Sequence, residues 1–213
     1  MKTIRIYSDY ICPFCYIGKV LADRLGSELN LPIEWLNIEI HPDTPPQGRS
    51  IHELFPPHIV QGMYENLNQM GTTLGLKFVA QDRLSNSHTA ILVGEYIHLH
   101  HPDQENGYHD AVFKAYFSEG KDIGKREILS DLLQELEIDP KVLPTALNDI
   151  AAQTRMQENA QTAIENGVTG TPTFFICNER VVGAQPYPSL LDAARRALGL
   201  EAADPNVLPI LKG

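Results

Sequence analysis

The segment Ile11-Cys12-Pro13-Phe14-Cys15-Tyr16 lies at the junction of two patterns near the start of the chain. Before it, the apolar alternation of residues 3–7 predicts a β-strand. After it, residues 16–25 carry apolar side chains at helical spacing, which predicts a helix. Cys12 therefore stands where a strand turns into a helix. Pro13 takes the first helical position, where its missing N–H costs no hydrogen bond.

This position favours ionisation of the first sulfur. Unpaired backbone N–H groups and the positive end of the helix dipole face Cys12 and favour the thiolate over the thiol. Cys15 follows one turn later on the same side of the helix, where it can form a disulfide with Cys12. The thiolate is the nucleophile in thiol–disulfide exchange, and in C-x-x-C motifs its pKa can fall to roughly 3.5–7.5. The motif therefore predicts a redox-active pair.

Two other interpretations of the pair are weaker. A structural zinc site needs four ligands, and the sequence has neither a second C-x-x-C nor an H-x-x-x-H motif. Two ordinary core cysteines would also fit, because free cysteine is often buried. The strand-to-helix setting favours redox chemistry, and we expect no metal.

Composition limits the classes of function. The chain has 213 residues, of which 43% are hydrophobic and 21% charged, as is typical of a globular protein. Seventeen basic and 27 acidic residues give a formal net charge of −10, which argues against nucleic acids and anionic membranes as partners. No apolar run approaches membrane-spanning length. The first predicted strand begins at residue 3, so we expect no secretory signal and a cytoplasmic protein, where a C-x-x-C is more often catalytic than structural.

Strands are predicted at both ends of the chain and helices between them. Residues 33–38 predict a second strand, parallel to the first. Helical periodicity follows over residues 57–71, 87–100, 107–119, 125–137 and 140–165. Strands are predicted again at 173–176 and 181–183, joined by a turn at 178–180, before a closing helix over 189–198 and a tail from Asp204. This order predicts an α/β fold in which one sheet is interrupted by an inserted helical subdomain.

Four segments resemble signatures of the DsbA-family thiol–disulfide oxidoreductases, in particular of their FrnE-like branch. They are residues 8–18, which include CPFC, and residues 113–117, 167–176 and 181–186. The resemblance covers nearly the whole chain. It implies a thioredoxin-like fold with a helical insertion. The order of the predicted elements places the thioredoxin-like part at residues 1–42 and 146–213 and the insertion at residues 43–145. The resemblance also implies a cis peptide bond before Pro172, facing the CPFC motif.

On this basis we interpret Cys12 as the nucleophile and Cys15 as the resolving cysteine, with no cofactor other than their disulfide or dithiol. Pro172 has no N–H to offer a neighbouring sulfur, and the backbone of Thr171 stays free to pair with an extended substrate peptide. The expected substrates are disulfides of proteins or small thiols. Phe14 is more often Trp in the branch, and the residues between the cysteines tune the redox potential, which therefore stays open.

Other residues near the motifs have two interpretations. Asp9 is either a proton acceptor or water-positioning group near Cys15, or a hydrogen-bonding loop residue, which we favour. Cys177 falls in the strand after Pro172 and is interpreted as a buried, inert thiol. The histidines at 98, 100 and 101 suit the dipole at a helix C-terminus better than a metal site.

Five residues of the insertion are candidates for its side of a substrate groove. They are Asn86, Ser87, His88, Tyr96 and Tyr116. Core packing is the favoured interpretation of the two tyrosines, and the sequence does not decide for the others.

Two alternative functions remain. The same fold serves a non-catalytic adaptor that binds a protein partner beside Pro172, or a glutathione-linked isomerase or transferase of small aromatic substrates. Related isomerases of this superfamily usually carry Ser where Cys12 stands. The intact Cys12–Cys15 pair favours the oxidoreductase over both alternatives.

Overall fold

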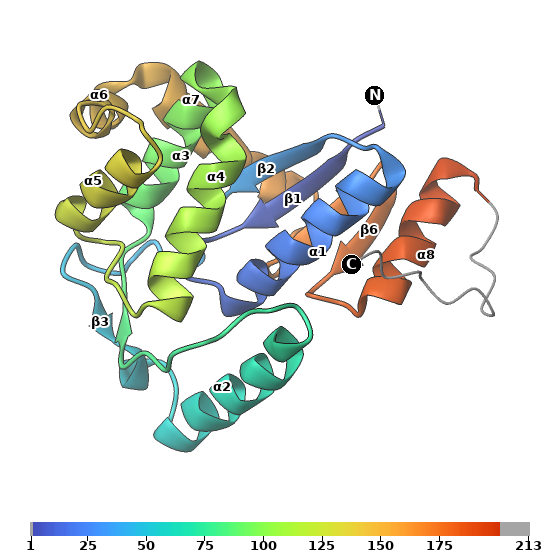
Figure 1. Ribbon diagram of the computed structural model, residues 1–213, viewed down its shortest axis with the longest axis horizontal. Coiled ribbons are helices and arrows are strands. Elements are labelled where there is room, and N and C mark those ends of the chain that lie inside the picture. Colours follow the sequence, from blue (N-terminus) through green and yellow to red (C-terminus); the bar gives the residue numbers. More distant parts are fainter. Residues whose placement is uncertain (1, 201–213) are drawn as a thin grey trace.

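A four-stranded sheet in the order β2–β1–β5–β6 forms the centre of the molecule, in a computed structural model that describes residues 2–200 (Figure 1). β1 (Ile4–Ser8) pairs in parallel with β2 (Ile33–Asn37) and antiparallel with β5 (Thr173–Ile176). β6 (Glu179–Val182) completes the hairpin with β5. The predicted α/β architecture is confirmed; the predicted tail from Asp204 lies outside the described residues.

The helix that follows β1 begins at the CPFC motif. α1 (Pro13–Leu29) has Cys12 as its N-cap residue in an extended conformation, and Pro13 takes the first turn. The helix ends at Asn30, whose φ of 50° is left-handed, a conformation that Asn tolerates better than most residues. The chain then returns as β2, parallel to β1, as the sequence predicts.

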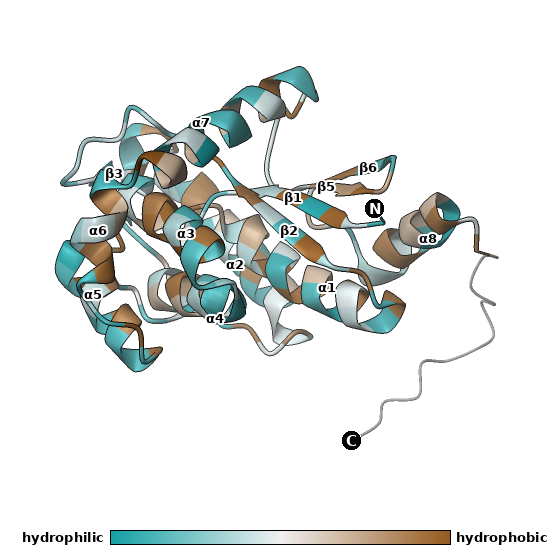
Figure 2. Ribbon diagram, turned by 90° about the horizontal axis from the view of Figure 1, so that it is seen from above, coloured by the Kyte–Doolittle hydropathy of each residue, from teal (hydrophilic) through white to brown (hydrophobic). Residues whose placement is uncertain are grey.

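Both faces of the sheet are covered. Ile4 and Ile6 of β1 lie in the main core together with buried residues of α1. Tyr7, on the opposite face, packs with Leu36 and with Ala163 of the helix α7 (Ile150–Glu165). α8 (Tyr187–Leu198) packs against β6 and α1, and Figure 2 shows apolar and polar residues on each of these helices, as expected of amphipathic helices.

The chain between β2 and β5 is mainly helical. Its helices before α7 are α2 (Pro57–Thr72), α3 (His88–His100), α4 (Pro102–Phe113), a π-helical turn Lys114–Ser118, α5 (Arg126–Glu135) and α6 (Val142–Asn148). A 3-10 turn, Ile51–Glu53, follows β3 (Arg49–Ser50), which pairs only with β4 (Arg83–Leu84). Within the described residues, this segment adds no strand to the main sheet, as predicted.

Two predicted helix boundaries are wrong. The helix predicted over residues 140–165 is two helices, α6 and α7, separated at Asp149, whose carboxylate accepts the backbone N–H of Ala152 at 2.8 Å. A capping aspartate competes with helix continuation. The helix predicted from Gly107 starts at Pro102, because proline is accepted in the first turn of a helix. No helix between residues 2 and 200 is long and apolar enough to cross a membrane.

Candidate active site

Cys12 and Cys15 lie in the first turn of α1 with different exposure. The backbone N–H of Cys12 donates to the carbonyl of Asp9 at 3.1 Å, and that of Cys15 donates to the carbonyl of Cys12 at 3.0 Å. Both side chains are free thiols. Cys15 is completely buried, whereas Cys12 retains 4% exposure. Cys15 is therefore the more buried of the two, as the sequence predicts.

Cys12 faces the segment that precedes β5. Its thiol donates to the carbonyl oxygen of Thr171 at 3.4 Å, and the Thr171–Pro172 peptide bond is cis. The carbonyl of Pro172 accepts the N–H of Gly183 at 2.8 Å, which fixes this segment to the end of β6. The fold thus brings residues 8–18 and residues 167–176 together, although they are far apart in the sequence.

The two thiols differ in acidity. Burial opposes ionisation of Cys12, but hydrogen bonds donated by the side chains of Cys15 and Thr171 outweigh it and lower the pKa of Cys12 below its ordinary value. Burial raises the pKa of Cys15 well above the ordinary value, and the neighbouring Cys12 raises it further. The site therefore favours a thiolate at Cys12 while Cys15 keeps its proton.

Asp9 is a fully buried carboxyl group beside the pair. Its oxygens accept the backbone N–H of Ile11 at 3.2 Å and of Ile40 at 2.8 Å, and the Ser87 side chain also bonds to it. Burial is the main cause that raises the pKa of Asp9 to about 6. Asp9 has the loop-bonding role that the sequence favours; proton transfer by this group stays a prediction.

Two residues of the site were not identified from the sequence. Ser8 is buried beside Cys15, where burial raises the pKa of the Cys15 thiol and the Ser8 side chain partly opposes that rise. Gly18 lies against the cis proline, because a Cβ on it would stand 3.0 Å from Cγ of Pro172. A glycine inside a helix lowers helix stability by about 1 kcal/mol relative to alanine. A glycine at position 18 of the predicted helix could therefore have indicated close packing at this point. Ser8 offered no such signal. Pro13 and Phe14 are half-buried beside the cysteines, and Phe14 packs against the main core.

The predicted place of Cys177, buried within a strand, is wrong, whereas its inertness stays a prediction. The residue is half-buried and lies outside β5, in the hairpin turn with Asn178, where its φ of 54° is left-handed. Two-residue hairpin loops of this kind require positive φ, which the alternation of the preceding strand does not reveal. β5 separates Cys177 from Pro172, so this thiol is at the other end of the strand from the redox pair.

The histidines of α3 pair with carboxylates. His98 lies 2.9 Å from Glu105 and His100 lies 3.3 Å from Asp149. Across residues 2–200, no group of three or more His, Cys, Asp or Glu side chains is arranged to hold a metal ion. The Tyr96 ring packs on His100.

The remaining insertion residues divide between the site and the core. Tyr116 is buried and donates to the carbonyl of Arg83 at 3.3 Å, which agrees with core packing. Asn86 donates to the carbonyl of Thr44. Ser87, which is the N-cap residue of α3, makes no side-chain capping bond and instead reaches Asp9.

Comparisons with known proteins agree with this fold. The model of the DSBA-like thioredoxin domain family matches residues 3–195. The chain is 26% identical over 182 residues to the uncharacterised protein YwbO of Bacillus subtilis, covering 85% of this chain and 90% of that one.

Solved structures share the fold at low sequence identity. A probable DsbA oxidoreductase of Streptomyces coelicolor superposes with a TM-score of 0.82 and 21% identity, covering 98% of this chain and 94% of that one. A 2-hydroxychromene-2-carboxylate isomerase gives a TM-score of 0.72 and 21% identity, with coverages of 92% and 94%. The cytosolic disulfide reductase DsbM of Pseudomonas aeruginosa with GSH gives 0.66 and 14%, with coverages of 92% and 96%.

Proposed function

This chain belongs to the DSBA-like thioredoxin domain family, and we propose that it is a protein thiol–disulfide oxidoreductase acting through Cys12 and Cys15. The observation that carries the proposal is the divergence of the two thiols. Cys12, at the start of α1, has a lowered pKa, whereas that of Cys15, one turn deeper, is raised. Cys12 is thus suited to act as the nucleophile, and Cys15 stays protonated until it acts as the resolving cysteine.

The proposed exchange takes place in two steps. The Cys12 thiolate attacks one sulfur of a substrate disulfide, forms a mixed disulfide and releases the other substrate sulfur as a thiolate. Cys15 then loses its proton and attacks the Cys12 sulfur. This step forms the Cys12–Cys15 disulfide and releases the second substrate thiol. The substrate gains two electrons and the pair loses two; the reverse sequence oxidises a substrate dithiol.

Asp9 and Thr171 are assigned supporting roles. Cys15 must give up its proton in the second step, and the buried Asp9 carboxyl, with a pKa of about 6, is the acceptor that we assign. The Thr171 backbone precedes β5 at the point where Cys12 faces it. An extended substrate segment would pair there as an added strand.

Substrate class and location are part of the same proposal. Protein disulfides are the main substrates that we assign, together with small-thiol disulfides, and a small thiol such as glutathione is the reductant that returns the Cys12–Cys15 disulfide to the dithiol. A neighbour of this fold named as a cytosolic disulfide reductase with GSH supports both this assignment and a cytoplasmic site of action. Membership of the FrnE-like branch remains a prediction from the sequence motifs.

The fold likeness to a 2-hydroxychromene-2-carboxylate isomerase favours a second candidate, a glutathione-linked isomerase of small aromatic substrates. An isomerase of this kind needs one activated thiol or hydroxyl group at the start of the helix. Cys15 would have no role in its reaction. The low acidity of Cys15, directly beside an acidic Cys12, therefore supports the oxidoreductase over the isomerase.

Reduction of insulin disulfides by the purified protein, with a dithiol to recycle it, tests the proposal. The parent protein should be active, Cys12→Ser inactive, and Cys15→Ser should accumulate a mixed disulfide with the substrate. Cys177→Ser, the matched control, should retain activity. Full activity of Cys12→Ser would overturn the proposal. A second result would also overturn it. In that case the parent protein reduces neither insulin nor scrambled ribonuclease, but isomerises an aromatic substrate with glutathione and leaves both of its thiols unchanged.

A further inference from the structure

A cavity of about 580 Å³ opens between α3, α7 and the chain that follows β2. None of the residues assigned to the redox site lines it. Its walls include Glu39, His88, Leu92, Met156, Gln157 and Ala160. The volume falls in the range of ordinary ligand pockets, and the mixture of apolar walls with a few polar groups is also typical of them.

Asp9 connects this cavity to the cysteine pair. Its backbone carbonyl accepts the N–H of Cys12, while its carboxylate accepts the N–H of Ile40 and bonds to Ser87. Ile40 and Ser87 are the direct chain neighbours of the cavity residues Glu39 and His88. In addition, Cys12 and Glu39 follow the carboxyl ends of the adjacent parallel strands β1 and β2, the edge where open α/β sheets bind ligands.

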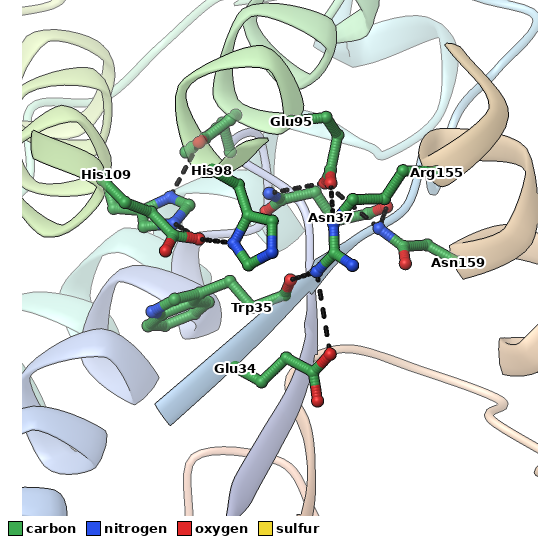
Figure 3. A network of polar contacts seen from close by, with 10 residues as sticks. Glu34, Trp35, Asn37, Glu95, His98, His109, Arg155 and Asn159 are labelled. Carbon is green, nitrogen blue, oxygen red and sulfur yellow. Dashed lines mark hydrogen bonds and ion pairs between the residues drawn. The ribbon is translucent and has the colours of Figure 1, made fainter. Parts of the chain in front are cut away.

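The walls of the cavity are held in place by a buried polar network, shown in Figure 3. Glu95 of α3 pairs with Arg155 of α7 at 2.7 Å and accepts a hydrogen bond from Asn159 of the same helix at 3.1 Å. Asn37 at the end of β2 donates to the same carboxylate at 3.2 Å. The two helices and the strand end are thereby fixed relative to one another, so the cavity is preformed rather than opened by its ligand.

The lining specifies the chemistry of the occupant. Its two ionisable side chains, Glu39 and His88, lie 3.3 Å apart and pair with each other, and the lining includes no lysine or arginine. An anionic ligand would therefore find no free cation there, and the chain as a whole carries −10. Leu92 and Met156 provide an apolar surface, while the exposed Gln157 amide offers hydrogen bonds to a peptide backbone.

We propose that this cavity is a specificity pocket that takes an apolar side chain of the protein substrate whose disulfide meets Cys12. The proposal rests on the proposed function for its substrate class. The occupant is a leucine-like or aromatic side chain close to the substrate cysteine, and spacings of two to four residues, which span about 7–14 Å of extended chain, are the ones to test. A residue bearing a carboxylate is excluded from the pocket by Glu39.

Filling the pocket tests the proposal. Ala160→Phe places a ring in the cavity from an exposed position of α7. Ala151→Phe, also exposed on α7 and outside the cavity lining, is the matched control. Gln157→Trp is a second filling variant, in case Ala160→Phe alters folding as judged by thermal unfolding.

The probes are fluorescently labelled peptides in which the substrate cysteine is replaced by serine. Each peptide carries leucine, alanine or aspartate at one test position, and this position lies two, three or four residues from the serine. The parent protein should bind the leucine peptide about tenfold more tightly than the alanine peptide at one spacing, and the aspartate peptide least. Ala160→Phe should abolish this difference and Ala151→Phe should keep it. Equal binding of leucine and alanine at every spacing, an unchanged preference in both filling variants, or preference for aspartate would overturn the proposal.

Reduction of 2-hydroxyethyl disulfide separates this inference from the proposed function, because that small disulfide reports thiol exchange without filling the cavity. Parent, Ala160→Phe and Ala151→Phe should reduce it at equal rates. If the parent reduces neither this disulfide nor insulin, the proposed function fails, and peptide binding still decides whether the cavity takes an apolar side chain. If reduction proceeds but the leucine preference is absent, the specificity pocket alone is wrong.

Discussion

The Cys12 thiol and the Thr171 carbonyl oxygen lie 3.4 Å apart, although the two residues are separated by 159 positions in the sequence. This contact places the more acidic thiol directly beside the backbone that precedes the cis proline. A substrate segment pairing with Thr171 would therefore present its sulfur to Cys12 and not to the fully buried Cys15. The predictions below follow from that arrangement and from the packing that maintains it.

Alkylation against pH should distinguish the three thiols. In variants that keep one cysteine and carry serine at the other two positions, we expect Cys12 to react with iodoacetamide at pH values below its ordinary pKa of about 8.5. Side-chain hydrogen bonds favour its thiolate, and a serine hydroxyl at position 15 can still donate one. Cys15 should react at least tenfold more slowly at pH 7, because burial raises its pKa and blocks access. Cys177 is the control. A Cys12 that titrates near 8.5, or a Cys177 that reacts faster, would show that the nucleophile is wrongly assigned.

Replacing Gly18 by alanine should disturb the redox site through Pro172. A Cβ at this position would meet Cγ of Pro172 at 3.0 Å and the Phe174 ring at 3.3 Å, so the cis-proline segment must move away from α1. Overpacking of this kind costs about 1–3 kcal/mol. We expect a loss of that size in the free energy of unfolding, together with slower insulin reduction.

Gly62→Ala provides the matched control for that substitution. Gly62 is also inside a helix, α2, but a Cβ there has nothing within 4 Å. Removing a helix glycine then stabilises by roughly 0.5–1 kcal/mol. If urea unfolding showed the same gain for Gly18→Ala, the close approach of α1 to Pro172 would not constrain the site.

The sequence predicted the parts of the fold that rest on local patterns. Alternation and helical periodicity identified β1, α1, β2 and the closing hairpin, because each buries one face of a short segment. The break at Asp149 was missed. A capping side chain stabilises a helix start by only a few tenths to about 2 kcal/mol, which is too little to be visible in the sequence pattern. Periodicity on both sides of it continues as in one helix.

The candidate site was predicted less completely. Cys12 and Cys15 are adjacent in the chain, so their spacing alone indicated redox chemistry. The partners of the neighbouring Asp9 are distant in sequence: Ile40 follows β2, and Ser87 precedes α3. Such contacts form only after α3 packs near the ends of β1 and β2, and no local pattern encodes them. The cavity beside Glu39 depends on α7, which is more than 100 residues from β2.

Glu95→Ala should destabilise the protein strongly. Glu95 is 1% exposed and holds Arg155, Asn37 and Asn159 together (Figure 3). Removing it leaves the Arg155 guanidinium without its close carboxylate, and breaking a buried ion pair costs about 3–5 kcal/mol. Urea denaturation should show a loss of this size.

Glu158→Ala, an exposed change on α7, is the control for Glu95→Ala and should alter the free energy of unfolding by less than about 0.5 kcal/mol. Similar losses in the two variants would contradict a stabilising network between α3, α7 and β2.

Asp9→Asn should remove a pH dependence of stability. Burial raises the pKa of Asp9 from 3.8 to about 6. Between these values the folded protein keeps a proton that the unfolded chain has lost. The free energy of unfolding of the reduced protein therefore falls as pH rises from about 4 to 6, by about 3 kcal/mol in total, and the loss is complete above pH 6. An asparagine does not titrate. In the variant, the slope of the unfolding free energy against pH should therefore lose the contribution of about one proton between pH 4 and 6.

The same substitution should also act on Cys12. The Asp9 carboxylate raises the pKa of Cys12 by its charge, so Asp9→Asn should shift the alkylation midpoint of Cys12 to lower pH. Asp131→Asn, an exposed change on α5, is the control and should leave both the midpoint and the slope unaltered. A lower midpoint with an unchanged slope would mean that Asp9 is ionised at ordinary acidity. An unchanged midpoint would mean that its charge does not reach the nucleophile, and a proton transfer from Cys15 to Asp9 would then lose its electrostatic support.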